Sequence, residues 1–208
     1  MNRSRNASGT NSYQQELKVK PEAVLQDYIN KRKEVKWLDL CCGEGRALLQ
    51  SAEWLAKRKM QDQATLLGID LVDQFQPIPS HIHCVQFQIT PLTEWTPSGR
   101  YDFITCIHGL HYLGDKLKVI TAALAALSED GTFIANFDLA SIVVAGDPKG
   151  QYLRQLFRTH EIDYKSRSKM IMCKGPRKIS MPLSYQGADD KAGPNYTGQP
   201  AVTSYYSK

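Results

Sequence analysis

Apolar runs alternate with amphipathic stretches from residue 35 onward. The run VKWLDL, Val35–Leu40, predicts a buried strand, and from Arg46 onward apolar residues recur at the spacing of an amphipathic helix. The compact stretch CCGEG, Cys41–Gly45, separates the two. Glycines there let the backbone turn sharply and let a ligand approach without meeting a Cβ, and the helix that follows presents free N–H groups. The pattern therefore predicts a strand, a glycine turn and a helix N-terminus that form a cradle for a small polar molecule.

The same patterns predict further elements along the chain. We expect three further helices, at Lys20–Lys33, Asp115–Leu127 and Gly146–His160. We expect four further strands, at Ala64–Val72, His81–Ile89, Tyr101–Leu110 and Thr132–Leu139. Strands that alternate with helices imply parallel strands joined by right-handed crossovers. We therefore predict an α/β fold with a doubly wound, mostly parallel sheet flanked by helices.

The two ends of the chain differ from this pattern. Residues 1–12 are polar and lack the apolar core of a secretory signal, which predicts a flexible tail before a single domain at 13–208. Near the other end, two strand-like runs around Gly175–Pro176 predict an antiparallel hairpin. The segment 187–208 is rich in Gly, Pro and Tyr and ends in a strand-like piece at Ala201–Tyr206. Tyrosines bury apolar surface while keeping a hydroxyl, so we expect a lid over the binding site rather than a plain tail.

Composition favours a soluble globular protein, with 42% hydrophobic and 23% charged residues. No apolar run approaches the ~20 residues that span a bilayer, so we expect no membrane association. The net charge of +5 includes basic clusters at residues 31–36 and 165–178. A nucleic-acid partner is one interpretation of these clusters. No aromatic-rich RNA motif lies near them, and we favour solvated faces of the protein instead.

The cysteines are odd in number and mostly embedded in apolar strands; they are Cys41, Cys42, Cys84, Cys106 and Cys173. This pattern predicts reduced, buried thiols in a cytoplasmic protein rather than a disulfide framework. No His or Cys pair follows the first two cysteines at zinc spacing. We therefore expect no metal site.

Two nucleotide classes compete for the cradle. A nicotinamide cofactor needs a third glycine in G-x-G-x-x-G, but Leu48 stands at that position. Glu44 lies between the two glycines, where a pyrophosphate would sit, and its carboxylate would repel a diphosphate. A phosphate-binding P-loop is excluded because no Gly-Lys-Ser/Thr follows. The remaining class is a ligand that carries no phosphate.

The stretch LDLCCGEGRAL, residues 38–48, resembles the first motif of class I S-adenosylmethionine-dependent methyltransferases. Later stretches are similar to that family in the same order: VQFQITPLTEW, RYDFITCIHGLHYL and LAALSEDGTFIANF. The resemblance covers roughly residues 20–160. It implies a Rossmann-like fold, S-adenosylmethionine as the cofactor and methyl transfer as the reaction.

The resemblance also implies roles at the amino-acid end of the cofactor. Asp39 would orient the amino group, and the carbonyl of Cys41 would accept a hydrogen bond from it. Gly43 and Gly45 would let the chain pass the methionine and ribose portions. Ile107 would offer its backbone to the amino-acid end. The family usually has a glycine at the position of Cys41, so we expect this side chain to turn inward.

At the nucleoside end, Asp70 would accept both ribose hydroxyls, since a carboxylate can take two parallel hydrogen bonds. Leu71 would pack on adenine, and Gln88 and Ile89 lie in the stretch where the family contacts that base. Gln88 replaces the acid that recognises adenine in many relatives. Its amide oxygen could still accept a hydrogen bond from the exocyclic amine.

Two histidines in the loop after the fourth strand are the candidate catalytic residues. His108 and His111 lie beside the expected cofactor site, and histidine can remove a proton from a hydroxyl or thiol acceptor near neutral pH. His111 stands at the Leu-His-aromatic position seen in relatives that act on small molecules. There it often serves packing and loop shape, so both interpretations stay open.

The methyl acceptor is less well defined by the sequence. The Asn/Asp-Pro-Pro-Tyr segment of enzymes that methylate adenine or glutamine is absent, and no Pro-Cys follows the fourth strand. These absences favour a small-molecule acceptor. A peptide or protein acceptor is the alternative among enzymes, and a protein that binds S-adenosylmethionine without catalysis is the alternative of another class.

Overall fold

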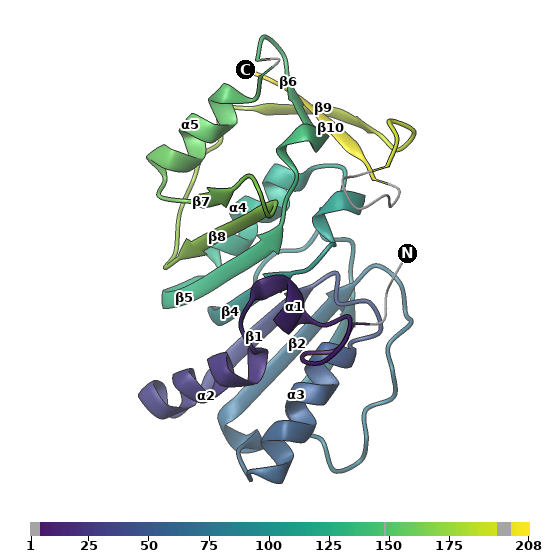
Figure 1. The fold of residues 1–208 in the computed structure, drawn as a ribbon, viewed down its shortest axis with the longest axis vertical. Helices are drawn as coiled ribbons and strands as arrows, with labels where there is room; N and C mark the ends of the chain where they lie inside the picture. Colours follow the sequence, from purple (N-terminus) through teal and green to yellow (C-terminus); the bar gives the residue numbers. More distant parts are fainter. Residues whose placement is uncertain (1–4, 148, 195–200) are drawn as a thin grey trace.

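A seven-stranded sheet forms the centre of the computed structural model, which describes residues 5–147, 149–194 and 201–208 (Figure 1). The strands lie in the order β3-β2-β1-β4-β5-β8-β7. The parallel strands are β1 (Val35–Leu40), β2 (Ala64–Asp70), β3 (Val85–Ile89), β4 (Tyr101–Cys106) and β5 (Leu127–Asn136). β8 (Met170–Lys174) runs antiparallel to β5, and β7 (Asp163–Lys165) runs antiparallel to β8. The predicted fold class is therefore confirmed.

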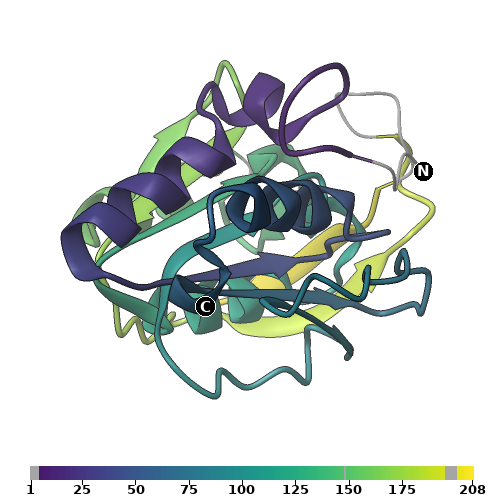
Figure 2. The same ribbon diagram turned by 90° about the horizontal axis from the view of Figure 1, so that it is seen from below.

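Helices cover both faces of this sheet. α2 (Pro21–Arg32) and α3 (Arg46–Lys57) lie on one face, as Figure 2 shows, and α4 (Lys116–Ala125) covers the other. Successive side chains of a strand point to opposite faces. In β4, Phe103 belongs to the apolar cluster with Leu48 of α3, whereas Ile104 belongs to the cluster with Ile120 of α4. The remaining helices are α1 (Tyr13–Leu17) and α5 (Gln151–Thr159), with single 3-10 turns η1 (Gln61–Gln63), η2 (Leu110–Tyr112) and η3 (Leu139–Ser141).

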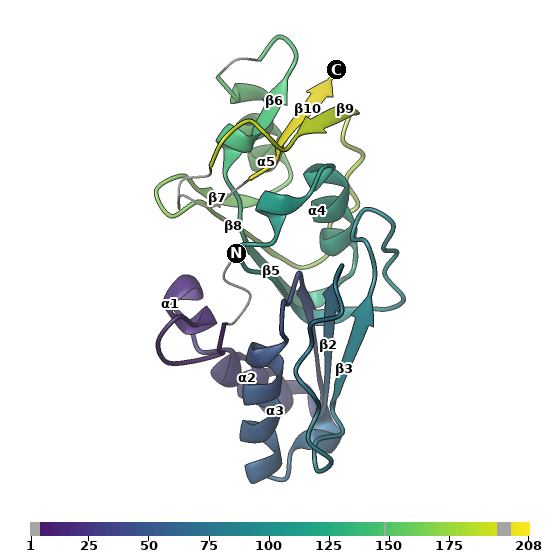
Figure 3. The same cartoon turned by 90° about the vertical axis from the view of Figure 1, so that its right-hand side faces the viewer.

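The antiparallel hairpin lies elsewhere than expected. The prediction of two strands around Gly175–Pro176 is wrong, because the described residues 175–183 contain no strand. β8 pairs instead with β7, which precedes it in the chain. The strand expected at His81–Ile89 is also shorter and begins at Val85. No helix follows β2 or β3, so the crossovers on either side of β3 run as loops (Figure 3).

A second, three-stranded sheet brings the C-terminal segment back to the body of the protein. Its order is β6-β10-β9, formed by β6 (Ile142–Val144), β10 (Thr203–Ser207) and β9 (Ser184–Asp189). Lys116 of α4 is fully buried and links this sheet to α4. Its ammonium donates to Val202 O and Ser204 Oγ, both at 2.7 Å. The strand-like piece expected at Ala201–Tyr206 thus corresponds to β10.

The N-terminal segment differs from the flexible tail predicted for residues 1–12. Residues 1–4 lie outside the described residues, but Ala7 is fully buried. The backbone N–H groups of Ala7 and Ser8 donate to Gln50 Oε1 of α3, at 2.8 and 3.2 Å. These contacts hold the segment against α3, although Gln50 lies more than 40 residues later in the sequence. The polar composition of the segment gave no sign of them.

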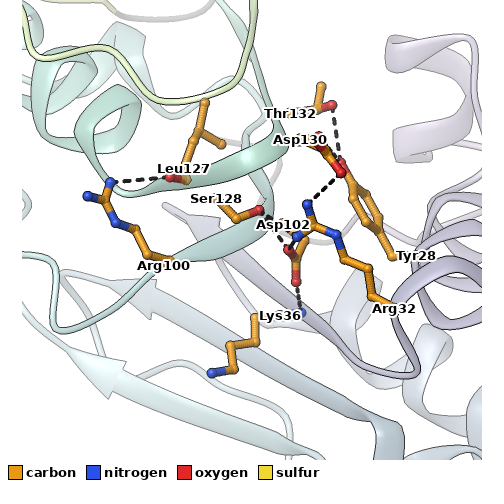
Figure 4. Close-up of polar contacts among 9 residues, drawn as sticks. All are labelled: Tyr28, Arg32, Lys36, Arg100, Asp102, Leu127, Ser128, Asp130 and Thr132. Carbon is orange, nitrogen blue, oxygen red and sulfur yellow. Dashed lines mark hydrogen bonds and ion pairs between the residues drawn. The ribbon is translucent and has the colours of Figure 1, made fainter.

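A polar cluster at the amino ends of the strands fixes α2 to the sheet (Figure 4). Asp102, at the start of β4, accepts hydrogen bonds from Arg32 Nη1 at 2.8 Å, Ser128 Oγ at 2.7 Å and the backbone N–H of Lys36 at 2.8 Å. Arg32 also reaches Asp130 at 2.6 Å. Asp102 is therefore a structural residue at the end of the sheet opposite to the cradle.

Within the part of the chain that the structure describes, no helix has the length and apolar character needed to cross a membrane.

Candidate functional site

A cavity of about 390 Å³ opens at the carboxyl ends of the parallel strands. In an open α/β sheet, ligands bind at this edge, where the strand order reverses. The order β2-β1-β4 puts that reversal at β1, directly below the cradle. The walls come from the turn after β1, the loops after β2, β3 and β4, and the N-terminal segment; they include residues 41–43, 70–72, 91–93, 107–109, 112–114, Arg5 and Tyr13.

The glycine turn has the tight geometry that the sequence predicted. Cys41, Gly43 and Gly45 all have positive φ, at 56°, 60° and 74°. Gly43 lines the cavity, and its N–H donates to Asp70 Oδ2 at 2.8 Å. Gly45 does not line the cavity; a Cβ there would lie 2.3 Å from the ring of Phe87. The structure therefore assigns Gly45 to packing against β3 rather than to passage of the ligand.

Cys41 explains how a side chain fits at a position where the family usually has glycine. Its sulfur lies against Cys106 and Gly109, and a Cβ added to Gly109 would lie 2.3 Å from the Cβ of Cys41. Its contact with Cys106 and its burial raise the pKa of the Cys41 thiol. The side chain thus turns inward, as expected, and Gly109 provides the space for it.

Asp39 is placed behind the cavity and not in its wall. Its side chain is fully buried and accepts hydrogen bonds from Tyr13 Oη at 2.8 Å and Thr105 Oγ1 at 2.6 Å. Burial raises the pKa of Asp39 to about 7, although both hydrogen bonds oppose that effect. Because Asp39 is fully buried and does not line the cavity, it is linked to the cavity only through Tyr13. This arrangement does not bring it to the amino group that the resemblance assigned to it.

Asp70 and Leu71 lie in the cavity wall, as predicted. Asp70 Oδ2 accepts from Gly43, and Oδ1 accepts a longer hydrogen bond of 3.3 Å from the N–H of Val72. A carboxylate offers about four lone-pair positions, so both oxygens can accept further hydrogen bonds from a diol. Leu71 is 64% exposed in this wall.

Three residues singled out in the sequence do not reach the cavity. Gln88 and Ile89 are exposed on β3, and the cavity wall at this strand end is formed by residues 91–93 instead. Gln88 donates to Thr90 Oγ1 at 2.8 Å. The Glu44 carboxylate accepts from Arg46 and Gln76, at 2.8 and 3.1 Å. Glu44 therefore binds the loop after β2. It does not line the cavity, where its carboxylate was expected to repel a diphosphate.

The two candidate histidines occupy different places. Ile107 and His108 line the cavity, and His108 Nε2 lies 3.0 Å from Glu16 Oε1 of α1. The backbone of His108 has a φ of 57°, and its N–H donates to Asn136 Oδ1 at 3.1 Å. His111 does not line the cavity and is 1% exposed; burial lowers its pKa to about 4. His111 therefore remains neutral at physiological pH and packs beside His108, with ring centroids 5.8 Å apart.

The described part of the expected lid supports the cavity from behind. No described residue of 187–208 lines the cavity, while Tyr196 lies outside the described residues. The N–H of Val202 donates to His111 O at 2.8 Å, and Ser204 Oγ donates to Gly114 O. Tyr206 is 3% exposed and donates to Asp115 at 3.0 Å. The segment thus holds the loop between β4 and α4, which forms one wall of the cavity.

Three residues of the N-terminal segment lie at the site although no sequence pattern predicted them there: Arg5, Tyr13 and Glu16. Arg5 and Tyr13 line the cavity, and Glu16 contacts both Arg5 and His108. α1 has only five residues, too few for a helical periodicity to be visible. The available signal was local: Ser12 caps α1 and is followed by Glu16 in its first turn.

Comparison with known families decides the assignment. Residues 13–167, most of the chain, match the model of a family described as a methyltransferase domain. The chain belongs to this methyltransferase family. The match confirms the predicted family and its cofactor, S-adenosylmethionine. No curated protein matches the sequence significantly.

Solved methyltransferase structures are similar to this methyltransferase at low identity. A plantazolicin methyltransferase in complex with SAH is 20% identical over 58% of this chain and 46% of its own, with a TM-score of 0.44. A coclaurine N-methyltransferase shows 17% identity over 56% of this chain and 36% of its own, with a TM-score of 0.40. An amino pentose methyltransferase from Micromonospora echinaspora shows 17% identity over 55% of this chain and 48% of its own, with a TM-score of 0.41. The chain thus spans less than half the length of these proteins, and such values carry no information about its substrate.

The residues present fit S-adenosylmethionine. The cavity volume lies within the ~300–1,000 Å³ usual for small-molecule sites. Gly43 leaves the turn open to a ligand, and Asp70 keeps acceptor capacity for a diol. Among the described residues there is no group of three or more His, Cys, Asp or Glu side chains that could hold a metal ion.

Proposed function

We propose that this protein transfers the methyl group of S-adenosylmethionine to a nucleophilic atom of a small-molecule acceptor. The observation that carries the proposal is the single cavity wall shared by Gly43, Asp70 and His108 at the carboxyl ends of β1, β2 and β4. It supports a cofactor held beside β1 and β2 and an acceptor beside the loop after β4. The family match supports the reaction class.

The sulfonium of the donor already activates its methyl group, so the protein's main task is to hold both reactants in line. Proximity and orientation of this kind supply about 7–11 kcal/mol of a barrier. Tyr112 and Leu113, which lie across β1 from Asp70, give the acceptor end of the cavity a largely apolar wall. This supports an acceptor with an apolar portion.

His108 is the candidate general base of the two histidines, because it lines the cavity and His111 does not. Glu16 Oε1 lies 3.0 Å from Nε2 of this histidine, a contact that holds the ring in one orientation. Asp70 is proposed to hold the ribose. Asp39 is proposed to act indirectly, by fixing Tyr13 in the cavity wall.

Incubation with methyl-labelled S-adenosylmethionine and a size-fractionated cell extract tests the proposal. We expect label in the small-molecule fraction, and none when Asp70→Ala replaces the wild type. Label in the protein fraction would favour the peptide or protein acceptor. Donor binding without any transfer would favour the non-catalytic alternative.

A further inference from the structure

Arg5 is the only lysine or arginine among the described residues of the cavity wall. Its side chain is 12% exposed. Within the described residues, its hydrogen bonds both leave from Nη1, to Asn11 Oδ1 at 3.2 Å and Glu16 Oε1 at 3.3 Å. A guanidinium carries five N–H donors in a planar fork. The two contacts therefore fix the side chain while leaving donors for a ligand.

A cation at this site needs a negative partner in the ligand. On the proposed function, the ligand is S-adenosylmethionine, whose sulfonium and ammonium are positive and whose only anionic group is the carboxylate. Charges of equal sign close together in a partly desolvated cavity repel each other strongly. Arg5 therefore favours the donor only in a pose in which the carboxylate meets its guanidinium.

The arrangement of the walls allows that pose. Asp70, the proposed ribose ligand, follows β2, whereas His108 follows β4 on the far side of β1. Glu16 links His108 to Arg5, through contacts of 3.0 and 3.3 Å. The amino-acid end of a donor whose ribose lies at Asp70 would extend across β1 toward this group.

We propose that Arg5 binds the carboxylate of the donor's amino-acid end and that Glu16 holds the guanidinium in place for it. Arginine forms paired, charge-assisted hydrogen bonds with carboxylates, which sets orientation as well as affinity. Glu16 stays ionised for this role: its contact with His108 and the nearby charge of Arg5 lower its pKa, against the effect of partial burial. Arg5 and Tyr13 of the N-terminal segment thus form part of the wall of the donor site.

Binding of S-adenosylmethionine and its decarboxylated form tests this proposal, because the two differ only in the carboxylate. Isothermal titration would compare the wild type with Arg5→Met, Arg5→Lys and the matched control Arg154→Met, which removes an exposed arginine of α5. We expect Arg5→Met to weaken S-adenosylmethionine binding about tenfold or more. The decarboxylated form should bind within about twofold of its wild-type affinity. Arg5→Lys should be intermediate and Arg154→Met unchanged.

The outcomes separate this inference from the proposed function. Equal weakening of both ligands by Arg5→Met would show that Arg5 only shapes the cavity, and an unchanged affinity for S-adenosylmethionine would show that it has no role; either overturns the inference alone. Wild-type protein that binds neither ligand would overturn the proposed function and, with it, the inference.

Discussion

The ammonium group of Lys116 lies inside the protein, and its burial predicts a specific dependence of stability on pH. Nζ donates to Leu113 O at 3.0 Å, in addition to Val202 and Ser204. Burial lowers the pKa of Lys116 from 10.5 to about 8. Between these two values the unfolded chain binds a proton that the folded protein has lost. The contribution of Lys116 to stability therefore rises as pH rises through this window.

The size of the effect follows from the two pKa values. A difference of about 2.5 units corresponds to about 3 kcal/mol in full, and about 2 kcal/mol of it appears between pH 7.5 and 9.5. Buried thiols such as Cys42, and the phenol of Tyr206, have raised pKa values and act in the opposite direction in more alkaline solution. The measurement must therefore compare two proteins in which these groups are the same.

Urea unfolding of the wild type and Lys116→Met at a series of pH values isolates the effect. We expect the difference in unfolding free energy to shift by about 2 kcal/mol in favour of the wild type between pH 7.5 and 9.5. Lys118→Met, an exposed lysine of the same helix, should show no such change. A difference between wild type and Lys116→Met that stays constant across this range would refute the argument from burial.

Three further substitutions and a truncation test other parts of the structure by unfolding free energies. Gly45→Ala should cost about 2–4 kcal/mol, because its φ is 74° and the new Cβ would lie 2.3 Å from Phe87. Asp102→Ala should cost about 2 kcal/mol, since the Arg32 side chain and a backbone N–H lose their acceptor. The unfolding free energy of Asp39→Asn should increase relative to that of the wild type as pH rises from 3.8 to about 7. In this range the folded wild type must hold a proton on Asp39 that the unfolded chain has lost, so the wild type loses stability as pH rises. Removing residues 184–208 should destabilise the whole protein, since this removes Val202 and Ser204, which supply two of the three acceptors of the buried ammonium.

Each of these expectations has a clear opposite. A Gly45→Ala protein as stable as the wild type would mean that the Phe87 ring moves away at little cost. For Asp102→Ala, a loss below about 0.5 kcal/mol would assign the cluster to solvated surface pairing. An Asp39→Asn difference that does not vary with pH would place the acid in a more polar setting than its burial indicates. A stable truncated protein that lacks only turnover would restore the idea of a lid.

The sequence predicted the sheet and the cradle because both depend on local patterns. The run Val35–Leu40, the turn at Cys41–Gly45 and the helix after Arg46 are contiguous, so their periodicities and glycines reveal them directly. Asp70 follows the same logic, because it ends a strand next to β1 in the sheet. The parallel order then brings the two strand ends together without any further information.

The residues that sequence reasoning missed or misplaced depend on contacts between distant parts of the chain. Nothing near Ala7 indicates that its N–H meets Gln50, 43 residues later. Lys116 looks like an ordinary surface lysine until Val202 and Ser204, 86 and 88 residues away, supply two of its acceptors. Asp39 was expected beside the cofactor because the family resemblance assigns it to the amino group, but Tyr13, 26 residues earlier in the chain, donates to it and separates it from the cavity.

The loop between β4 and α4 shows why these distant contacts matter for function. It supplies more of the cavity wall than any other loop, yet it has a left-handed residue at His108 and only one 3-10 turn of its own. Glu16 holds it from the N-terminal side, and Val202 and Ser204 hold it from the C-terminal side. A loop that is weakly structured by itself becomes a defined wall only when both chain ends are docked. The shape of this wall is therefore set by the segments with the weakest local patterns. If the proposed acceptor binds there, we expect variation in those segments to change the acceptor while leaving the cradle intact.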